Sequence, residues 1–220
     1  MNLSVKVFQE AMKQLGTFTE RDFNVVVHGD LKWKQFAKHI DWSGKSVHDV
    51  GCHIGLVPMR AKNKGASFVL GWDLRKDIVD FNNRFVIRAL PVKKGHLTTI
   101  FEQQGLNDSS PSLETDIRLC LGVINKFDKG AFERAIVKLC TGCKETLVLE
   151  TCFDYSENQD LNVTVNKHYP EGHMWRYFAR VSRPYLRKLL TANGFAVTHE
   201  IQSVVYHHHQ RETWIAERNN

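Results

Sequence analysis

The sequence predicts a Rossmann-like α/β protein whose sheet is mostly parallel and ends in an antiparallel strand pair. Short apolar runs alternate with segments of helical spacing along most of the chain. The runs at 46–50 and 68–73 flank a helical segment, and the three together form a βαβ unit. The last two runs, at 195–205 and 212–217, are joined by a histidine-rich turn at 207–209, which favours an antiparallel pair at one sheet edge.

In the first half of the chain, apolar residues recur at helical spacing over 3–16 and again over 31–40. A strand at 46–50 then leads through a glycine-containing turn into a helix that Gly65 ends as its C-cap. The elements expected up to the middle of the chain are helices at 3–16, 31–40, 57–64 and 76–88 and strands at 46–50, 68–73 and near 97–101.

The alternation continues in the second half. Ser182 caps a helix that has Pro184 in its first turn and ends at Gly194. The expected elements are strands at 116–121, 146–150, 195–205 and 212–217 and helices at 129–140 and from residue 183. The polar stretch 154–173 is expected to be a loop, and its length suggests a functional role rather than a simple connection.

Length and composition fit an α/β domain with a small addition. We expect an N-terminal helical element over 1–40 and the ligand-binding domain over 41–220. Hydrophobic residues make up 42% and charged residues 25%, as in ordinary globular proteins. No apolar run approaches the roughly 20 residues of a membrane helix, and the N-terminus lacks the apolar core of a signal peptide. We therefore expect a cytoplasmic protein without a membrane partner.

The formal net charge of +6 is compatible with RNA or another polyanion as a partner, although many basic proteins bind no nucleic acid. The five cysteines carry no sign of a disulfide framework, since no export signal accompanies them. A structural zinc site usually has two cysteine or histidine pairs, and Cys140-x-x-Cys143 lacks the second pair. We expect no bound metal.

The segment 47–55 together with Asp73 carries the clearest chemical signal. Gly51 and Gly55 let a ligand approach the backbone closely after the first strand of the βαβ unit. The helix that follows offers unpaired N–H groups at its start. Asp73 follows Asp49 by 24 residues and ends an apolar strand, where an acidic residue can accept both hydroxyls of a ribose. The pattern predicts a nucleoside-containing ligand.

The glycine spacing also bears on which ligand this is. A dinucleotide fingerprint has the form G-x-G-x-x-G, whereas here Gly51 and Gly55 enclose three residues, with His53 in the middle. Asp49 precedes the turn and suits a positively charged ligand group, such as the sulfonium and amino groups of S-adenosylmethionine. Leu74 is expected to contact the adenine. His53 either lines the ligand or is only a surface residue of the turn.

The residues 49–55, Asp-Val-Gly-Cys-His-Ile-Gly, resemble the D-x-G-C-G-x-G motif of class I S-adenosylmethionine-dependent methyltransferases. The tripeptide at 71–73 is similar to the end of their second strand, and 120–124, which includes Leu121, to their fourth-strand motif. The resemblance implies a seven-stranded sheet with helices on both faces and S-adenosylmethionine as cofactor, with Leu121 beside it.

More narrowly, the chain resembles the tRNA wobble-uridine carboxymethyltransferase family. The similar stretches lie at 31–34, 121–124, 147–151 and 210–214, so the resemblance covers about 31–214. It implies that Lys32 and Arg211 occupy positions that bind a donor carboxylate, where they can also stabilise an anionic nucleophile. Glu150, at the end of the fifth strand, is a candidate on the substrate side. These three residues are our candidates for a catalytic role.

Two positions depart from the family pattern. His53 stands where the family has the middle glycine, and Asn125 stands where it has a tyrosine that helps hold the carboxylate of carboxy-S-adenosylmethionine. The loss of that tyrosine favours ordinary S-adenosylmethionine over the carboxylated donor. We expect both His53 and Asn125 to line the cofactor.

The segment 173–178 interleaves aromatic and basic residues, which is what base stacking combined with phosphate binding requires. Trp175, Arg176 and Tyr177 are therefore candidate substrate-binding residues. The alternative is a helix that packs its aromatic residues into the core. We expect methyl transfer to an oxygen or nitrogen of RNA, possibly of a tRNA uridine. A small-molecule methyltransferase and a non-catalytic partner subunit that binds S-adenosylmethionine are the alternatives.

Overall fold

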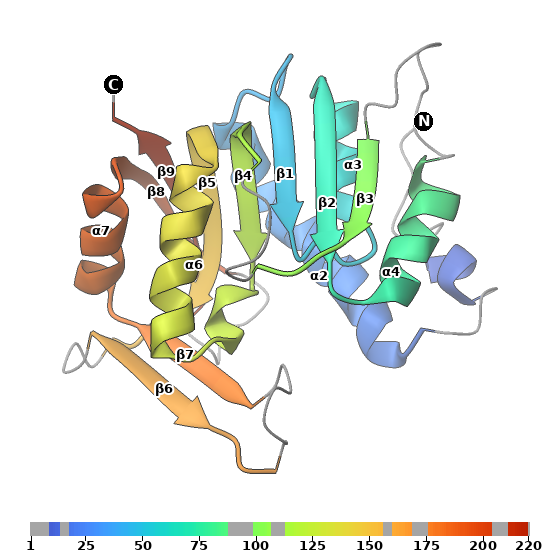
Figure 1. Ribbon diagram of the computed structural model, residues 1–220. Coiled ribbons are helices and arrows are strands. Elements are labelled where there is room, and N and C mark those ends of the chain that lie inside the picture. Colours follow the sequence, from blue (N-terminus) through green and yellow to red (C-terminus); the bar gives the residue numbers. More distant parts are fainter. Residues whose placement is uncertain are drawn as a thin grey trace. The chain divides into compact units, whose positions relative to one another are not determined.

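The computed structural model describes residues 9–13, 18–87, 99–106, 113–155, 160–168, 176–203 and 211–219. The chain divides into two compact units, residues 1–105 and 106–220, which are described separately below. This division differs from the boundary at residue 40 that the sequence suggests, and the earlier boundary remains a prediction. Figure 1 shows the elements of both units.

The first unit contains three parallel strands in the order β3-β2-β1, with bounds Ser46–Val50 for β1, Phe68–Asp73 for β2 and Thr99–Gln103 for β3. The first two bounds agree with the sequence prediction, and β3 begins two residues later than predicted. β1 and β2 are buried over most of their length, which explains why they read as continuous apolar runs rather than alternating ones.

The helices of the first unit are α2 (Glu20–Phe36), α3 (Leu56–Asn63) and α4 (Lys76–Phe81), with a short 3₁₀ turn at Ala37–His39 and a π-helical turn at Asn82–Val86. Residues 9–13 are also helical, within the predicted helix 3–16. The predicted helix at 31–40 is too short. α2 begins eleven residues earlier because Thr19 and Asp22 form a capping box, a start signal that apolar spacing alone does not reveal.

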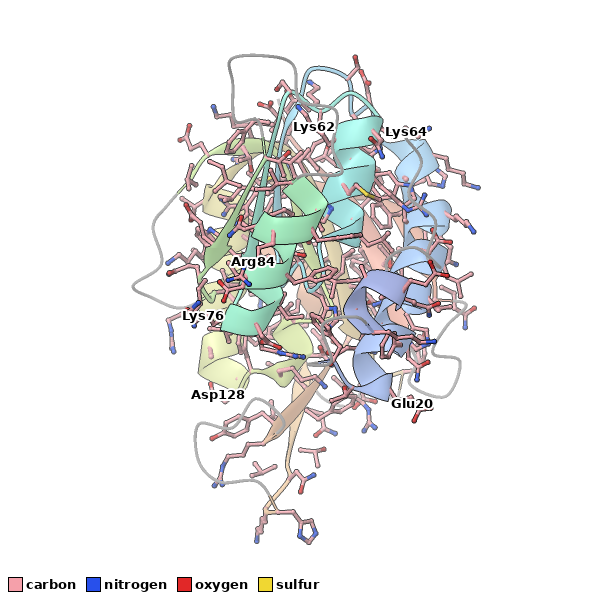
Figure 2. The ribbon with its side chains drawn as sticks, turned by 90° about the vertical axis from the view of Figure 1, so that its right-hand side faces the viewer. Glu20, Lys62, Lys64, Lys76, Arg84 and Asp128 are labelled. Atoms are coloured by element: carbon pink, nitrogen blue, oxygen red, sulfur yellow. The ribbon has the colours of Figure 1, made fainter. Side chains whose placement is uncertain are left out.

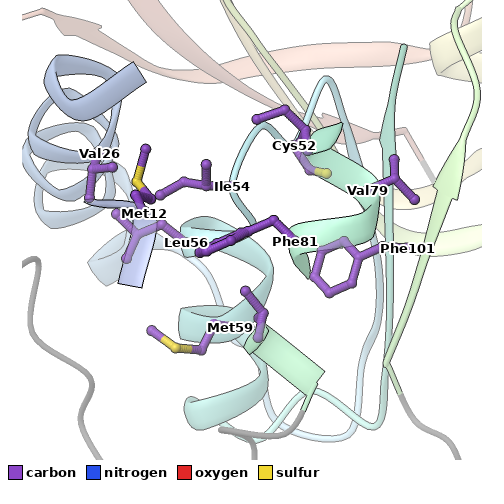
Figure 3. Packing of buried hydrophobic residues seen from close by; sticks show 11 residues of the cluster. Met12, Val26, Cys52, Ile54, Leu56, Met59, Val79, Phe81 and Phe101 are labelled. Atoms are coloured by element: carbon purple, nitrogen blue, oxygen red, sulfur yellow. The ribbon is translucent and has the colours of Figure 1, made fainter. Parts of the chain in front are cut away.

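The hydrophobic core of the first unit holds the glycine turn in place. Figure 3 shows Cys52 and Ile54, which belong to the turn, packed among side chains from the surrounding elements. The buried members of this cluster are Met12, Val26, Cys52, Ile54, Leu56, Met59, Ile78, Val79, Phe81, Val86 and Phe101. Since two residues of the turn are part of the core, the turn cannot move without disturbing it.

Basic side chains lie at the ends of two helices of this unit. Figure 2 shows Lys62 and Lys64 at the end of α3 and Lys76 at the start of α4. Lys62 Nζ donates to the carbonyls of Ala66 and Ser67 at 2.7 and 2.8 Å, which satisfies acceptors just beyond the helix end. None of the helices in the described part of the chain is both long and apolar enough to cross a membrane.

The second unit contributes four strands in the order β4-β5-β9-β8, with bounds Thr115–Leu121, Cys143–Cys152, Arg211–Arg218 and Phe195–Gln202 respectively. β4 and β5 are parallel, whereas β9 is antiparallel to both β5 and β8. The three strands of the first unit and these four make up the seven strands of the predicted mostly parallel sheet with its antiparallel end pair. The predicted fold class is confirmed.

The helices of the second unit are α6 (Lys129–Thr141), α7 (Arg183–Ala192) and a 3₁₀ turn, η3 (Ile124–Lys126). Ser182 caps α7 by accepting from the Tyr185 N–H, as predicted, and Gly194 follows the helix at φ +81°.

The predicted loop at 154–173 is wrong in part. Leu161–Val165 (β6) and Tyr177–Val181 (β7) pair as an antiparallel ribbon separate from the main sheet (Figure 1). β6 alternates apolar and polar residues and is rich in valine and threonine, a strand signal that the polar surroundings masked. Tyr177 therefore begins a strand. The alternative considered for 173–178, a helix packed into the core, is wrong at this end of the segment.

Candidate functional site

The turn between β1 and α3 has an unusual backbone. Gly51, His53 and Gly55 have positive φ angles of 76°, 47° and 71°, and Gly55 is the residue that precedes the first turn of α3. The N–H groups of Gly51 and Cys52 both donate to the Trp72 carbonyl at 2.8 Å, which fixes the turn to the neighbouring strand. The turn therefore presents open backbone at the carboxyl end of β1, where ligands bind in sheets of this kind.

Asp73 lies at the mouth of this turn. Its Oδ2 accepts a hydrogen bond of 3.0 Å from the His53 N–H, and its Oδ1 accepts one of 3.0 Å from the Arg75 N–H. The carboxylate is half-buried rather than enclosed. Each of its oxygens has a second lone pair, so the group has acceptor capacity for two further hydroxyl donors.

Asp49 is a second carboxylate at the same turn, and it is 3% exposed. Its burial and the negative charge of Asp73 together raise the pKa of Asp49 to about 7, and the positive charge of Lys32 counteracts part of this rise. Lys32 lies on α2 and is itself buried. The site thus combines two acidic groups with one nearby cation, and it favours a ligand that brings additional positive charge.

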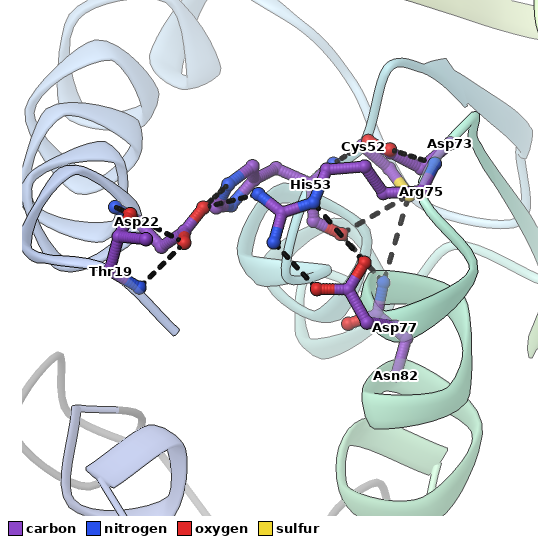
Figure 4. Close-up of polar contacts among 8 residues, drawn as sticks. All are labelled: Thr19, Asp22, Cys52, His53, Asp73, Arg75, Asp77 and Asn82. Carbon is purple, nitrogen blue, oxygen red and sulfur yellow. Dashed lines mark hydrogen bonds and ion pairs between the residues drawn. The ribbon is translucent and has the colours of Figure 1, made fainter. Parts of the chain in front are cut away.

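A polar network ties the start of α2 to the turn, as Figure 4 shows. Asp22 Oδ1 lies 3.0 Å from His53 Nε2 and accepts a bond of 2.6 Å from Arg75 Nη1. Asp22 Oδ2 accepts from the Thr19 N–H and hydroxyl at 2.9 and 2.8 Å. Burial alone would raise the pKa of Asp22, but the hydrogen bonds from His53, Thr19 and Arg75 outweigh it and hold that pKa far below its usual range.

Sequence reasoning missed Asp22 and Arg75. The capping box at residues 19–22 was a readable signal for Asp22, whereas nothing in the local pattern singles out Arg75. Arg75 also pairs with Asp77 at 2.6 Å, and its hydrogen bonds to Asp77 and Asp22 raise its pKa further. Together these residues join α2, the turn and the residues that follow Asp73.

Contacts on three sides hold His53 in its left-handed conformation. Its N–H donates to Asp73, its ring meets Asp22, and its carbonyl accepts from Asn82 Nδ2 at 2.6 Å. Asn82 is fully buried, and its Oδ1 has no hydrogen-bond partner among the described residues. A non-glycine residue at positive φ costs energy and persists when its surroundings determine it this strongly.

Leu74 follows Asp73 and exposes 59% of its surface. Gln103 Nε2 donates to its carbonyl at 3.2 Å, and a Cβ on Gly105 would lie 2.6 Å from Leu74 Cδ2. Leu74 can therefore occupy this position because Gly105 has no side chain. It presents an apolar surface directly beside the Asp73 carboxylate.

In the second unit, four of the residues singled out in the sequence lie together. Leu121, at the end of β4, is in register with Glu150 on β5. Glu150 is fully buried, and its Oε2 lies 3.7 Å from Arg211 Nη1. With its amide oxygen turned toward Arg211, Asn125 accepts from Arg211 Nη2 at 3.3 Å and donates to the Gly122 carbonyl at 2.8 Å. Arg211 thus has acceptors on two sides.

The structure describes only some of the remaining candidate residues. Arg176 lies just before β7 and Tyr177 begins it, and both are half-buried; Trp175 and the histidines at 207–209 lie outside the described residues. Burial raises the pKa of the Cys140 and Cys143 thiols to about 12 and about 11, and both cysteines are free. The described segments contain no group of three or more histidine, cysteine, aspartate or glutamate residues that could hold a metal ion.

No protein-family model matches the chain. It is 36% identical over 74 residues to the tRNA U34 carboxymethyltransferase of Pseudomonas savastanoi pv. phaseolicola, a match that covers 30% of this chain and 23% of that protein. The protein of the same name from Colwellia psychrerythraea is 49% identical over 45 residues, which are 20% of this chain and 14% of that one. The matches thus span less than a quarter of the length of these relatives.

Solved structures match over most of the chain. The magnesium protoporphyrin IX methyltransferase of Synechocystis with bound S-adenosylmethionine has a TM-score of 0.64 and 17% identity, and covers 92% of this chain and 86% of its own. The 1,6-didemethyltoxoflavin-N1-methyltransferase of Burkholderia thailandensis has a TM-score of 0.65 and 12% identity, and covers 100% and 92%. At these identities the likeness is one of fold, which is that of S-adenosylmethionine-dependent methyltransferases.

Proposed function

We propose that this chain is an S-adenosylmethionine-dependent methyltransferase that binds its methyl donor at the glycine turn of the first unit. The observation that carries this proposal is the charge at the turn. Burial, and then repulsion by the negative charge of Asp73, raises the pKa of Asp49 to about 7. A ligand with a sulfonium and an ammonium group relieves this repulsion, whereas a pyrophosphate would add to it.

Each residue of the turn has a role in this proposal. Gly51 and Gly55 leave room for the ligand beside the backbone, and Asp73 accepts the two ribose hydroxyls with its free lone pairs. Leu74 supplies an apolar surface for the adenine. His53 keeps the turn open through its contacts with Asp73 and Asp22. The resemblance of 120–124 to the methyltransferase motif is our basis for assigning Leu121 and Asn125 to the cofactor as well.

When bound, S-adenosylmethionine supplies a methyl group that a nucleophile can displace from the sulfonium. The protein contributes mainly by holding the acceptor atom in line with that group. Arg211 and Lys32 can orient anionic groups, because each is a buried or nearly buried cation. Glu150 balances the charge of Arg211, and we assign it to the substrate side. We favour ordinary S-adenosylmethionine over its carboxylated form, since Asn125 turns its amide oxygen toward Arg211 and supplies no hydroxyl.

For the acceptor we propose an oxygen or nitrogen of RNA, such as that of a tRNA uridine, in a cytoplasmic enzyme. The net charge of +6 and the partial likeness to tRNA U34 carboxymethyltransferases support an RNA substrate. A small-molecule acceptor is the second candidate, because the names of the two solved methyltransferases above refer to magnesium protoporphyrin IX and 1,6-didemethyltoxoflavin.

Calorimetric titration with S-adenosylmethionine tests the cofactor assignment. We expect micromolar binding by the unaltered protein and at least tenfold weaker binding by Asp73→Ala, because a charged acceptor of two hydroxyls is lost. Asp80→Asn, a substitution at an exposed site on α4, is the matched control and should bind normally. A protein that binds no S-adenosylmethionine would contradict the proposal. Transfer of a tritiated methyl group to tRNA or to a metabolite extract then separates the two acceptor classes.

A further inference from the structure

The β6–β7 ribbon leaves the main body of the second unit near the carboxyl ends of β4 and β5. β7 packs against η3, the turn after β4, and Phe153, directly after β5, forms an isolated bridge with Val181. Figure 1 shows the ribbon below those strand ends. In sheets of this type the carboxyl ends of the parallel strands face the ligand. The ribbon is therefore placed to meet a substrate that approaches this edge of the second unit.

The two faces of the ribbon differ in character. Because side chains alternate along a strand, Leu161, Ala179 and Val181 share one face, and all three are buried. Thr164 is in register with Phe178, and Asn162 with Arg180, so these four residues share the opposite face. Phe178 is an aromatic ring on the face that the apolar residues do not occupy, and it is only half-buried.

Two cations lie over the Phe178 ring. Lys126 Nζ, from η3, is 5.1 Å from the ring centroid, and Arg180 Cζ is 5.2 Å from it. Both distances are within the range of a cation–π interaction. The ring therefore holds two long, flexible side chains from different elements beside each other, at positions they would not keep by themselves.

The surroundings are also basic. The described residues of the ribbon and its ends include Lys167, Arg176 and Arg180 as cations and Asp160 as a carboxylate. A second carboxylate, Asp154, lies 3.5 Å from Asn162 Nδ2. Lys126 also directly follows Asn125, which contacts Arg211. A polyanion with regularly spaced charges complements such a row of cations.

We propose that the outer face of the β6–β7 ribbon, with Lys126, is the surface that binds the RNA backbone, and that Phe178 fixes Lys126 and Arg180 as a pair of phosphate contacts. This inference rests on the proposed function and adds the residues that recognise the acceptor. Contacts of this kind hold an RNA in position without reading its sequence. The half-buried Tyr177 and Arg176 lie at the adjoining end of the ribbon.

The test is fluorescence anisotropy with a labelled single-stranded oligoribonucleotide and with unfractionated tRNA, measured over a series of salt concentrations. For Lys126→Gln combined with Arg180→Gln we expect binding to weaken about tenfold or more and the slope of log K against log salt to fall by about 2, one for each lost phosphate contact. Lys144→Gln combined with Lys188→Gln removes two charges from exposed positions elsewhere in this unit and is the matched control.

A third variant tests the role of the ring. Phe178→Leu keeps an apolar side chain and all charges but removes the cation–π contacts, so we expect a roughly threefold loss of RNA affinity at an unchanged melting temperature. Unchanged RNA affinity in the double variant would overturn the inference. Polyglutamate that displaces the labelled RNA as well as unlabelled RNA does would also overturn the inference, because the surface would then suit acidic proteins equally.

Calorimetric titration of the same variants with S-adenosylmethionine separates the two proposals. If the protein binds S-adenosylmethionine but the ribbon variants bind RNA as tightly as the unaltered protein, only the proposed RNA-binding surface is refuted. If the ribbon variants weaken RNA binding but the protein binds no S-adenosylmethionine, the proposed methyl donor is refuted. The chain would then be an RNA-binding module.

Discussion

The N–H of His53 donates a hydrogen bond of 3.0 Å to Asp73 Oδ2, so the middle of the glycine turn and the carboxylate that ends β2 are joined directly. The residues are 20 positions apart in the chain. The turn can therefore keep Asp73 oriented before a ligand arrives, which reduces the cost of ordering the site on binding.

The conformation of His53 predicts a difference between two substitutions. Alanine at φ 47° retains the backbone strain, whereas glycine relieves it, and both lose the contact of the ring with Asp22. We expect His53→Gly to be about 1 kcal/mol more stable than His53→Ala. Urea unfolding of the two variants measures this difference, and equal midpoints with equal slopes would show that the left-handed conformation carries no strain.

Asp49 predicts opposite effects on stability and on ligand binding. Its pKa is raised to about 7 in the folded protein, above the ordinary value of 3.8, so the folded state holds an extra proton between these values. Stability contributed by this group is therefore lost as the pH rises from about 4 to about 7. We expect Asp49→Asn to stabilise the protein at pH 8 by roughly 1–3 kcal/mol, as followed by thermal unfolding.

The same substitution should weaken the binding of S-adenosylmethionine, because the ionised Asp49 faces a cation in the proposed complex. The affinity of the unaltered protein should rise as the pH passes through about 7, with proton release on binding, and Asp49→Asn should lose this dependence. Titrations in buffers of different ionisation enthalpy measure the released protons. An affinity that is flat from pH 6 to 8 would argue against the charge complementarity.

The Asp22 network predicts that α2 and the turn respond together. Asp22→Asn weakens the pairing with Arg75 and His53, whereas Thr19→Ala removes only the hydroxyl of the cap. We expect faster hydrogen exchange near the start of α2 in both variants. Only Asp22→Asn should also weaken the binding of S-adenosylmethionine, by several-fold. Equal ligand affinity in the two variants would show that the network stabilises the helix without affecting the turn.

Glu212 predicts part of the acid sensitivity of the second unit. It is buried and accepts from the Trp214 indole at 2.8 Å, from the Tyr155 hydroxyl and from Arg183. Burial would raise its pKa, but the hydrogen bonds from Arg183, Tyr155 and Trp214 bring the net shift below the ordinary value of 4.5.

For a carboxylate with a lowered pKa, the stabilisation is present above the unfolded-state value and is lost as the pH falls through the folded-state value. The melting temperature should therefore fall less between pH 5 and pH 3 in Glu212→Gln than in the unaltered protein. At pH 7 the variant should be less stable, because Arg183 loses its charged partner. An equal fall in melting temperature between pH 5 and pH 3 in the two proteins would contradict this assignment.

Elements and site residues could be predicted from the sequence where a local pattern has a single physical cause. The bounds of β1 and β2 could be predicted because these strands are buried on both faces. The positions of Gly51, Gly55 and Asp73 follow from the βαβ unit, which brings the ends of neighbouring parallel strands together.

The rest depends on contacts between distant segments. Arg75 gains its role only because the start of α2 lies beside the turn, and the positions 22 and 75 are 53 residues apart. β6 and β7 also stabilise each other across a long connection, and the five alternating residues of β6 are too few to stand out from their polar surroundings. Pairing across such separations has no signature in a short window of sequence.

The position of β9 between β5 and β8 has a consequence for the synthesis of this protein on the ribosome. β5 and β8 have no hydrogen-bonding contact with each other in the strand order of this unit, and both pair with β9, which is made after them. Until β9 emerges, the nascent polypeptide exposes two unpaired strand edges, which are templates for aggregation. A chain that terminates at residue 210 lacks β9 and cannot join β5 to β8.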